Sequence, residues 1–194
     1  MGHEERVRQL FYNVCAHSNM TDYDELYKLL CSRLIHFSAA IIGSFHQAEE
    51  IVSDVFVLIW QKREQLQEIR NPLVYIYVCT KNHSLNALPK NKGSHLSFDA
   101  LDKDALAIIP DVEERLASKE LAQIIEHAIS ELPGRCQMIF RLVKMDGFSY
   151  KDVAELLGIS PKTVDDQLAI AIKKLGLTIR LHMHQFQDSP RFNS

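Results

Sequence analysis

Residues 148–168 read FSYKDVAELLGISPKTVDDQL and predict two short helices joined by a tight turn. Ser149 can cap the first helix, and Gly158 can take the left-handed conformation that ends it. Ser160 and Pro161 fit the start of the second helix, because serine caps a helix N-terminus and proline suits its first position. Caps and a glycine turn at these offsets are what a DNA-binding helix-turn-helix requires.

The apolar residues of this stretch form the inner face of the pair: Val153, Ala154 and Leu157 from the first helix, then Val164 and Leu168 from the second. The outer face of the second helix would then meet a major groove. We expect the DNA-binding side chains to be Ser160, Lys162, Thr163, Asp166 and Gln167. A plain helical hairpin with a glycine turn is the alternative interpretation of this pattern.

The residues just upstream are also patterned for helices. Apolar residues recur at helical spacing through Leu121, Ile124, Ile125, Ala128, Ile129 and Leu132. Pro133 and Gly134 end that helix. A second helix follows and ends near Asp146 and Gly147; its apolar residues are Cys136, Ile139, Phe140 and Val143.

The N-terminal half predicts three further helices. Two apolar stripes comprise Leu26, Leu29, Leu30, Leu34 and Phe37, then Ile51, Val52, Val55, Phe56 and Ile59. Ser44, with Gln47 three residues later, is placed to cap the second of these helices. Asn71 and Pro72 open the third helix, and Pro89 ends it.

Residues 93–117 differ from both halves. They are rich in acidic residues, Pro110 interrupts them and no helical period persists, so they predict an acidic linker. We therefore expect an all-α fold, with two small helical domains joined by this linker and the helix-turn-helix in the second. The boundaries are a leader (1–21), a first domain (22–92), the linker (93–117), a second domain (118–181) and a flexible tail (182–194).

Composition limits the possible functions. The chain has 194 residues and a formal net charge of −3, so no global basic field attracts nucleic acid. Its four cysteines form no C-x-x-C pair, which is typical of free thiols in a reducing compartment. The start has no apolar signal core, and no apolar run approaches the roughly 20 residues that span a bilayer. We expect a cytoplasmic protein without direct membrane insertion.

The second half resembles region four of sigma factors. That family follows Leu-Pro and an apolar helix with Gly-x-Ser-Tyr-x-Glu-Ile-Ala-x-x-Leu-Gly-Ile-Ser-x-x-Thr-Val. Here Leu132 and Pro133 are followed by residues 147–164, which read GFSYKDVAELLGISPKTV.

The first half resembles region two of the same family. Residues 48–60, AEEIVSDVFVLIW, are similar to the family's AEDLVQEVFxxLW, and residues 75–82, YIYVCTKN, are similar to WLYxIARN. Both modules in this order, with one linker and no other module, resemble the plan of extracytoplasmic-function sigma factors.

The resemblance implies a transcription-initiation factor that binds core RNA polymerase and directs it to specific promoters. The first domain would dock the polymerase clamp through Glu49, Glu50, Ser53, Asp54 and Trp60. It would meet the minus-ten promoter element through Tyr75, Lys81, Asn82 and Asn86. The second domain would bind the polymerase flap and read the minus-thirty-five element. The family also implies an anti-sigma factor, whether soluble or membrane-bound. The chemistry would belong to the polymerase, so we expect no enzyme activity and no cofactor.

Departures from the family pattern bear on DNA contact. Asp165 and Asp166 stand where the family often has basic or small residues, and Ile170 replaces a common arginine. The basic run that often closes region two is reduced to Lys90 and Lys92. Because cations that neutralise phosphates dominate DNA affinity, we expect these departures to weaken direct DNA binding without altering the fold.

Two other classes of protein remain as alternatives. A response regulator with a helix-turn-helix would share part of the motif, but it needs an N-terminal receiver of alternating strands and helices. Residues 22–92 show no strand alternation. A zinc-dependent anti-sigma factor or enzyme would need clusters of His or Cys. The spacing of His182 and His184 does not place both on one helix face, so we expect no metal site.

Overall fold

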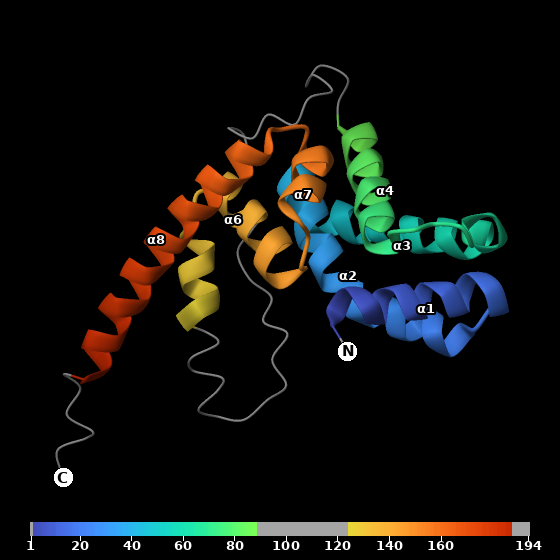
Figure 1. The fold of residues 1–194 in the computed structure, drawn as a ribbon, viewed down its shortest axis with the longest axis horizontal. Coiled ribbons are helices and arrows are strands. Elements are labelled where there is room, and N and C mark those ends of the chain that lie inside the picture. The colour runs from blue at the N-terminus through green and yellow to red at the C-terminus, as the bar shows by residue number, and fades with distance from the viewer. Residues whose placement is uncertain (1, 89–123, 188–194) are drawn as a thin grey trace, which may run out of the picture.

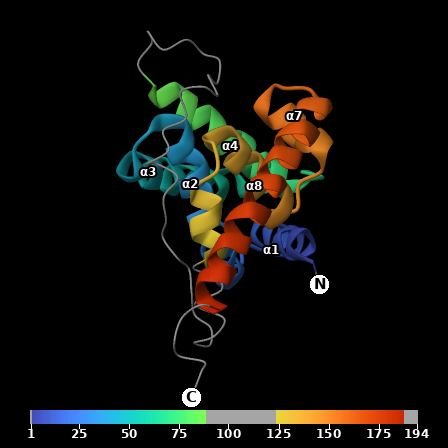
Figure 2. The same ribbon diagram turned by 90° about the vertical axis from the view of Figure 1, so that its left-hand side faces the viewer.

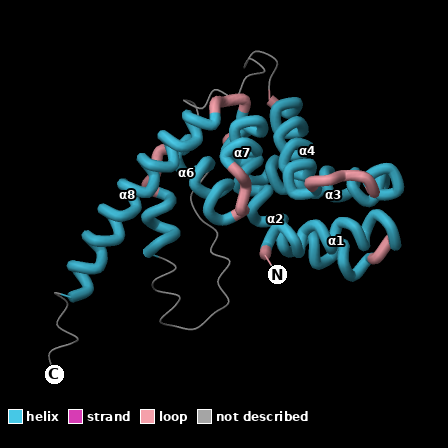
Figure 3. Tube along the Cα trace, viewed as in Figure 1, coloured by secondary structure: helices cyan, strands magenta, loops and turns pink. Residues whose placement is uncertain are grey.

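Figure 1 shows the computed structural model, in which helices and short connections make up the described chain. The structure describes residues 2–88 and 124–187, with side chains described as far as residue 180. Within these ranges no strand occurs, and Figure 3 shows the same helices as a tube. The predicted all-α fold is therefore confirmed. The predicted linker, residues 93–117, lies outside the described residues.

Residues 2–88 form a bundle of α1 (His3–His17), α2 (Met20–Ile42), α3 (Phe45–Lys62), the 3₁₀ turn η1 (Arg63–Leu66) and α4 (Pro72–Ala87). The long helix α2 packs against α1, α3 and α4, so its apolar side chains meet those of three neighbours. The core residues from α2, α3 and α4 include Leu26, Leu30, Leu34, Val52, Val55, Phe56, Ile59 and Ile76. Most of these belong to the two predicted apolar stripes.

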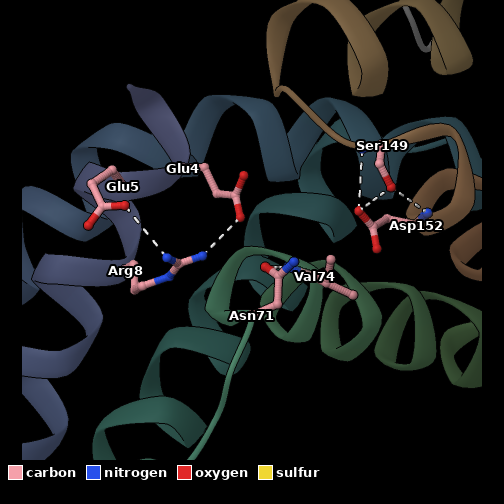
Figure 4. A network of polar contacts seen from close by, with 7 residues as sticks. All are labelled: Glu4, Glu5, Arg8, Asn71, Val74, Ser149 and Asp152. Atoms are coloured by element: carbon pink, nitrogen blue, oxygen red, sulfur yellow. Dashed lines mark hydrogen bonds and ion pairs between the residues drawn. The ribbon is translucent and has the colours of Figure 1, made fainter. Parts of the chain in front are cut away.

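The predicted starts of α3 and α4 are confirmed by their capping interactions. The Ser44 hydroxyl accepts a hydrogen bond from the Gln47 amide at 3.4 Å. The Asn71 side chain accepts from the Val74 amide at 3.2 Å (Figure 4). A proline occupies the first position of α4. These bonds satisfy amides that have no partner inside the helix, so they fix where each helix begins.

The N-terminal residues, which we predicted to be a leader, form helix α1 and complete the core of the bundle. Its inward side chains are at most 2% exposed and comprise Val7, Leu10, Phe11 and Val14. Their spacing is a helical signal that could have predicted this element. The Gln67 side chain donates to the Cys15 carbonyl at 3.2 Å and ties the end of α1 to the chain after η1. On the outer face Arg8 pairs with Glu4 and Glu5 (Figure 4).

The second half begins with a helix at residues 124–130. It continues through α6 (Gly134–Phe140), the π-helical turn η4 (Arg141–Met145), α7 (Tyr150–Leu157) and α8 (Pro161–Gln187). A small core joins the first of these helices to α6 and α8 and contains Ala128, Ile129, Leu132, Cys136, Ala171 and Leu175. Figure 2 shows α8 running beside this part of the chain. Helix α8 continues past Leu181, where we predicted the domain to end.

The two halves pack directly against each other. Helix α7 lies against α4, and α6 lies against α2 (Figure 1). The Tyr77 ring of α4 is buried between two phenylalanines from opposite sides of this contact. Its centroid lies 5.0 Å from that of Phe37 in α2 and 4.9 Å from that of Phe148, just before α7. One apolar cluster therefore continues from the first bundle into the helix-turn-helix.

Candidate nucleic-acid and polymerase-binding surfaces

Helices α7 and α8 form the helix-turn-helix that the sequence predicted. The Ser149 hydroxyl accepts from the Asp152 amide at 3.1 Å, and the Asp152 carboxylate accepts from the Ser149 amide at 3.3 Å (Figure 4). This reciprocal capping box fixes the start of α7. Gly158 ends α7 with a φ of +67°, a conformation that favours glycine. The Ile159 amide then donates to the Ala154 carbonyl at 2.9 Å and sets the turn into α8.

The start of α8 carries most of the predicted DNA-binding residues at the surface. The Ser160 hydroxyl accepts from the Thr163 amide at 3.0 Å, so Ser160 caps this helix as predicted. Lys162 and Asp166 are both exposed and form an ion pair one turn apart, with 2.8 Å between Nζ and Oδ1. Asp165 is exposed beside them. Because two carboxylates accompany one lysine, this end of α8 offers little net positive charge to phosphates.

Gln167 differs from the other predicted reading residues because its side chain is engaged inside the domain. Its Oε1 accepts from the Cys136 thiol of α6 at 3.1 Å, and the residue is half-buried. Burial raises the pKa of the Cys136 thiol, which keeps the sulfur protonated as a donor. The structure therefore separates Gln167 from the exposed pair formed by Lys162 and Asp166.

The predicted clamp-binding residues of α3 share one exposed face. This face comprises Glu49, Glu50, Ser53 and Asp54, and the apolar stripe of α3 is buried on the other side. The Ser53 hydroxyl donates to the Glu49 carbonyl at 2.9 Å, so it stays against its own helix. Val57 follows one turn later and is 49% exposed. We did not predict Val57, although an apolar residue three positions after Asp54 breaks the polar pattern of this face.

Trp60 lies one turn beyond Val57 and is half-buried. The Tyr23 ring packs edge-on against it with centroids 5.2 Å apart. The Arg63 guanidinium sits 4.6 Å from the centre of the indole ring and donates to the Trp60 carbonyl at 2.7 Å. These contacts hold the indole in one position at the end of the acidic face.

The predicted minus-ten residues of α4 lie in different environments. Asn82 and Asn86 are exposed and stand one turn apart. Tyr75 is half-buried against a phenylalanine of α1, and burial raises its pKa to about 12. Lys81 is also half-buried, and its Nζ donates to the Leu156 carbonyl of α7 at 2.8 Å. Both asparagines therefore face solvent, whereas Tyr75 and Lys81 are engaged within the protein.

A polar cluster that no sequence pattern indicated joins the two halves at Asp146. Its buried carboxylate accepts from the Tyr77 hydroxyl and from the Arg33 guanidinium, each at 2.7 Å. Arg33 also donates to the Met145 carbonyl at 2.7 Å. Burial raises the pKa of Asp146, and the two donors offset only part of that effect. The sequence pattern indicates only that Asp146 lies near the end of a helix, beside Gly147.

Within the described residues, no three His, Cys, Asp or Glu side chains are grouped so as to hold a metal ion. The side chains of His182 and His184 lie outside the described part of the chain. The four cysteines are free thiols. Among the described helices, none has the length and apolar character needed to cross a membrane.

Comparisons with known proteins agree with both halves of this architecture. Two family models match the chain: Sigma-70 region 2 over residues 23–93, and Sigma-70, region 4 over residues 122–175. The ferric citrate uptake sigma factor FecI of Escherichia coli K12 is 27% identical over 134 residues, covering 68% of this chain and 76% of FecI. The ECF RNA polymerase sigma factor SigW of Bacillus subtilis is 22% identical over 153 residues, covering 75% of this chain and 78% of SigW.

A solved structure shares the fold. CnrH, in complex with the cytosolic domain of CnrY, has a TM-score of 0.51 at 15% identity, over 91% of this chain and 98% of that one. A response regulator would need a receiver with strands, and the described residues contain none. Because the family models match both halves in order and the named relatives are sigma factors, the chain belongs to the extracytoplasmic-function sigma factors of the sigma-70 family, which act in transcription initiation.

Proposed function

We propose that this sigma factor docks core RNA polymerase through the acidic face of α3 and positions it on promoters through α4 and α8. The observation that carries the docking surface is the exposed row of Glu49, Glu50, Ser53 and Asp54 on a helix whose opposite face is fully packed. Val57 adds an exposed apolar side chain to this row, and Trp60 lies at its end. Apolar side chains with a charged surround are typical of a protein-binding surface.

The charge of this face indicates the kind of surface that it would meet. The nearby His46 lies 3.6 Å from Glu50, and the other carboxylates of the face have no lysine or arginine partner among the ion pairs of the described residues. Unpaired carboxylates on an exposed helix favour a basic partner and speed its approach. A basic surface on the polymerase clamp would be such a partner.

Promoter reading would be divided between the two halves. The amides at the start of α8, next to the Ser160 cap, can approach a phosphate, and Lys162 and Thr163 can reach a major groove. Asn82 and Asn86 of α4 expose side-chain amides that both donate and accept, as contact with base edges requires. The flap of polymerase would hold the second half near the minus-thirty-five element.

The remaining roles follow from this arrangement. The chain would contribute binding and positioning, and the reaction would take place at the active site of polymerase in the cytoplasm. An anti-sigma factor is a further proposed partner, because CnrH was solved in complex with the cytosolic domain of CnrY. The likeness to CnrH supports a shared fold, and we infer from it that this chain binds a partner similar to CnrY.

The test of the function is run-off transcription with core polymerase on genomic fragments, compared with variants of the acidic face. Glu50→Arg and Asp54→Arg reverse exposed charges and leave the apolar stripe intact, so folding should survive with a shift of about 0.5 kcal/mol or less. Both should lose polymerase in a pull-down and give less transcript. Glu5→Arg is the matched control, because Glu5 is exposed on α1, away from this face. Wild-type pull-down by both variants would remove the face from the interface.

A further inference from the structure

The outer face of α8 exposes apolar side chains to water. Ile170 is 42% exposed and Leu177 is 51% exposed. They lie seven residues apart, which places them on the same face of a helix with 3.6 residues per turn. The opposite face is buried within the second half through Val164, Leu168, Ala171 and Leu175. Figures 1 and 2 show α8 at the edge of the molecule, so no other described helix covers its outer face.

The residue type at position 170 favours contact with protein over contact with DNA. Ile170 stands where this family often has arginine. An isoleucine cannot bond to a phosphate, and its exposure costs free energy in proportion to the apolar area left in water. Single exposed apolar residues are common on protein surfaces, whereas apolar residues that share one face with charges around them are typical of an interface.

The charges on this face change sign along the helix. Asp166 lies four residues before Ile170, and Lys173 lies three residues after it. Both are exposed, and Lys173 forms none of the ion pairs found among the described residues. Lys162 bonds to Oδ1 of Asp166, and the other carboxylate oxygen can accept a further donor. A face that is acidic, apolar and basic in this order is complementary to its own reverse.

We propose that the outer face of α8 is a self-association surface, on which a second copy of the chain docks with its α8 antiparallel. A two-fold axis near Ile170 would bring the two isoleucines together at the centre. Each Asp166 would then face Lys173 of the other copy, because the two residues lie almost equally far from the axis on opposite sides. A two-fold interface requires a self-complementary face of this kind, and each of its contacts occurs twice.

The size of the face predicts a weak association. The stretch from Thr163 to Leu177 is about 20 Å long at 1.5 Å per residue, which is less than a permanent interface uses. Pairing should therefore depend on protein concentration. Thr163 and Asp166 also belong to the end of α8 that we propose to meet DNA, so a paired copy could not bind promoter DNA. That consequence rests on the proposed function, whereas the self-association does not.

The position of the contact can be tested by sedimentation velocity of the full chain from micromolar to millimolar concentration. Ile170→Arg would place two guanidinium groups at the two-fold axis and should raise the dimer dissociation constant roughly tenfold or more. Ile172→Arg is the matched control. Ile172 is 51% exposed, but it lies about 200° around the helix from Ile170 and should not face the second copy. Circular dichroism verifies the folding of each variant.

The antiparallel pairing can be tested by charge reversal and mixing. Asp166→Lys alone sets lysine against lysine across the axis, and Lys173→Asp alone sets aspartate against aspartate, so each variant should be monomeric. An equal mixture of the two variants places a lysine opposite an aspartate at both contacts. The mixture should therefore dimerise at the wild-type concentration. Lys28→Asp reverses an exposed lysine on α2 and should leave the wild-type dimer unchanged.

Three results would overturn the proposal. A wild-type chain that stays monomeric at millimolar concentration would exclude a second copy as the occupant of this face. Equal effects of Ile170→Arg and Ile172→Arg would place the contact elsewhere. A mixture of the two reversed variants that remains monomeric would exclude the antiparallel pairing of Asp166 with Lys173. None of these measurements includes polymerase or DNA, so they are independent of the test of the proposed function.

Discussion

The Arg33 guanidinium and the Asp146 carboxylate lie 2.7 Å apart although 113 positions separate them in the chain. This pair connects α2 of the first half to the turn that precedes the helix-turn-helix. Because burial raises the pKa of Asp146 despite its two hydrogen-bond donors, the surroundings disfavour its charged form overall. The pair therefore fixes how the halves meet and adds little to the free energy of unfolding.

The raised pKa of Asp146 predicts a pH dependence of stability. A carboxyl group with a higher pKa in the folded chain binds its proton more tightly there. Its contribution to stability is fully present below its pKa in the unfolded chain, about 3.9. That contribution is lost as pH rises through its pKa in the folded chain. We therefore expect the wild type to gain free energy of unfolding relative to Asp146→Asn as pH falls from about 7 to about 4. Urea titrations followed by circular dichroism measure the difference.

The comparison with Asp146→Asn also controls for a nearby group whose pKa is shifted in the opposite direction. His3 is close enough to sense Arg33 and Asp146, and burial is the largest cause of its lowered pKa. A histidine with a lowered pKa loses its contribution to stability as pH falls below its pKa in the unfolded chain. Its effect therefore opposes the trend from Asp146. His3 is present in both proteins, so the effect of its burial, the largest cause of its lowered pKa, cancels in the comparison. A difference in unfolding free energy that stays constant over this pH range would contradict the assignment to Asp146.

Helix α1 should be an integral part of the first half. Leu10 is fully buried, so Leu10→Ala should lower the free energy of unfolding by about 2 to 5 kcal/mol through lost packing and a cavity. Tyr12→Ala is the control on the same helix, because Tyr12 is 53% exposed, and it should cost about 0.5 kcal/mol or less. Chemical denaturation measures both. Equal effects of the two substitutions would show that α1 does not contribute to the core.

The helix-turn-helix was predictable because its determinants lie close together in sequence. Ser149 bonds to a residue three positions away, and Ser160 does the same, so both caps are visible in the sequence. Gly158 takes the left-handed conformation that its place at the helix end required. Helix α1 has the apolar spacing of a helix, but Gly2 provides no side-chain cap to mark its start.

The state of individual site residues depends on contacts between distant segments, which no local pattern reveals. Lys81 and Asn82 are adjacent in sequence, yet the first bonds to α7 and the second faces solvent. Gln167 falls on the predicted reading helix, but a thiol from α6 engages its side chain. The sequence thus indicates which helices carry the candidate surfaces. The packing of the two halves decides which side chains those surfaces expose.

Asn82 should act in promoter opening rather than in polymerase binding. Asn82→Ala removes an exposed amide, so folding and polymerase association should be unchanged. Melting near the minus-ten element should weaken, because flipped bases lose a hydrogen-bonding partner on the protein. Permanganate footprinting of the holoenzyme on double-stranded promoter DNA measures the melting. Melting at the wild-type level would count against Asn82, and a loss that accompanies unfolding would assign the residue to packing.

The ion pair at the start of α8 should set the balance between specific and non-specific DNA binding. Lys162→Ala should weaken holoenzyme binding and lower its salt slope by about one unit, as loss of one phosphate contact predicts. Asp166→Lys should strengthen non-specific binding and blur promoter choice, because it replaces a repelling charge with an attracting one. Competition with unrelated DNA at several salt concentrations measures both effects. An unchanged salt slope for Lys162→Ala would show that this lysine does not contact a phosphate.

Promoter binding by this chain should depend on polymerase. Lys162 at the start of α8 is paired with Asp166, Lys81 bonds to α7, and the whole chain has a net charge of −3. Polymerase would supply cations of its own and hold both halves at promoter spacing, which raises their effective concentration. The most direct measurement is a salt-titrated mobility shift on a promoter fragment identified by run-off transcription, with the free protein and with the holoenzyme. We predict weak binding by the free protein and tight binding by the holoenzyme at physiological salt, whereas tight, sequence-specific binding by the free protein would contradict the account.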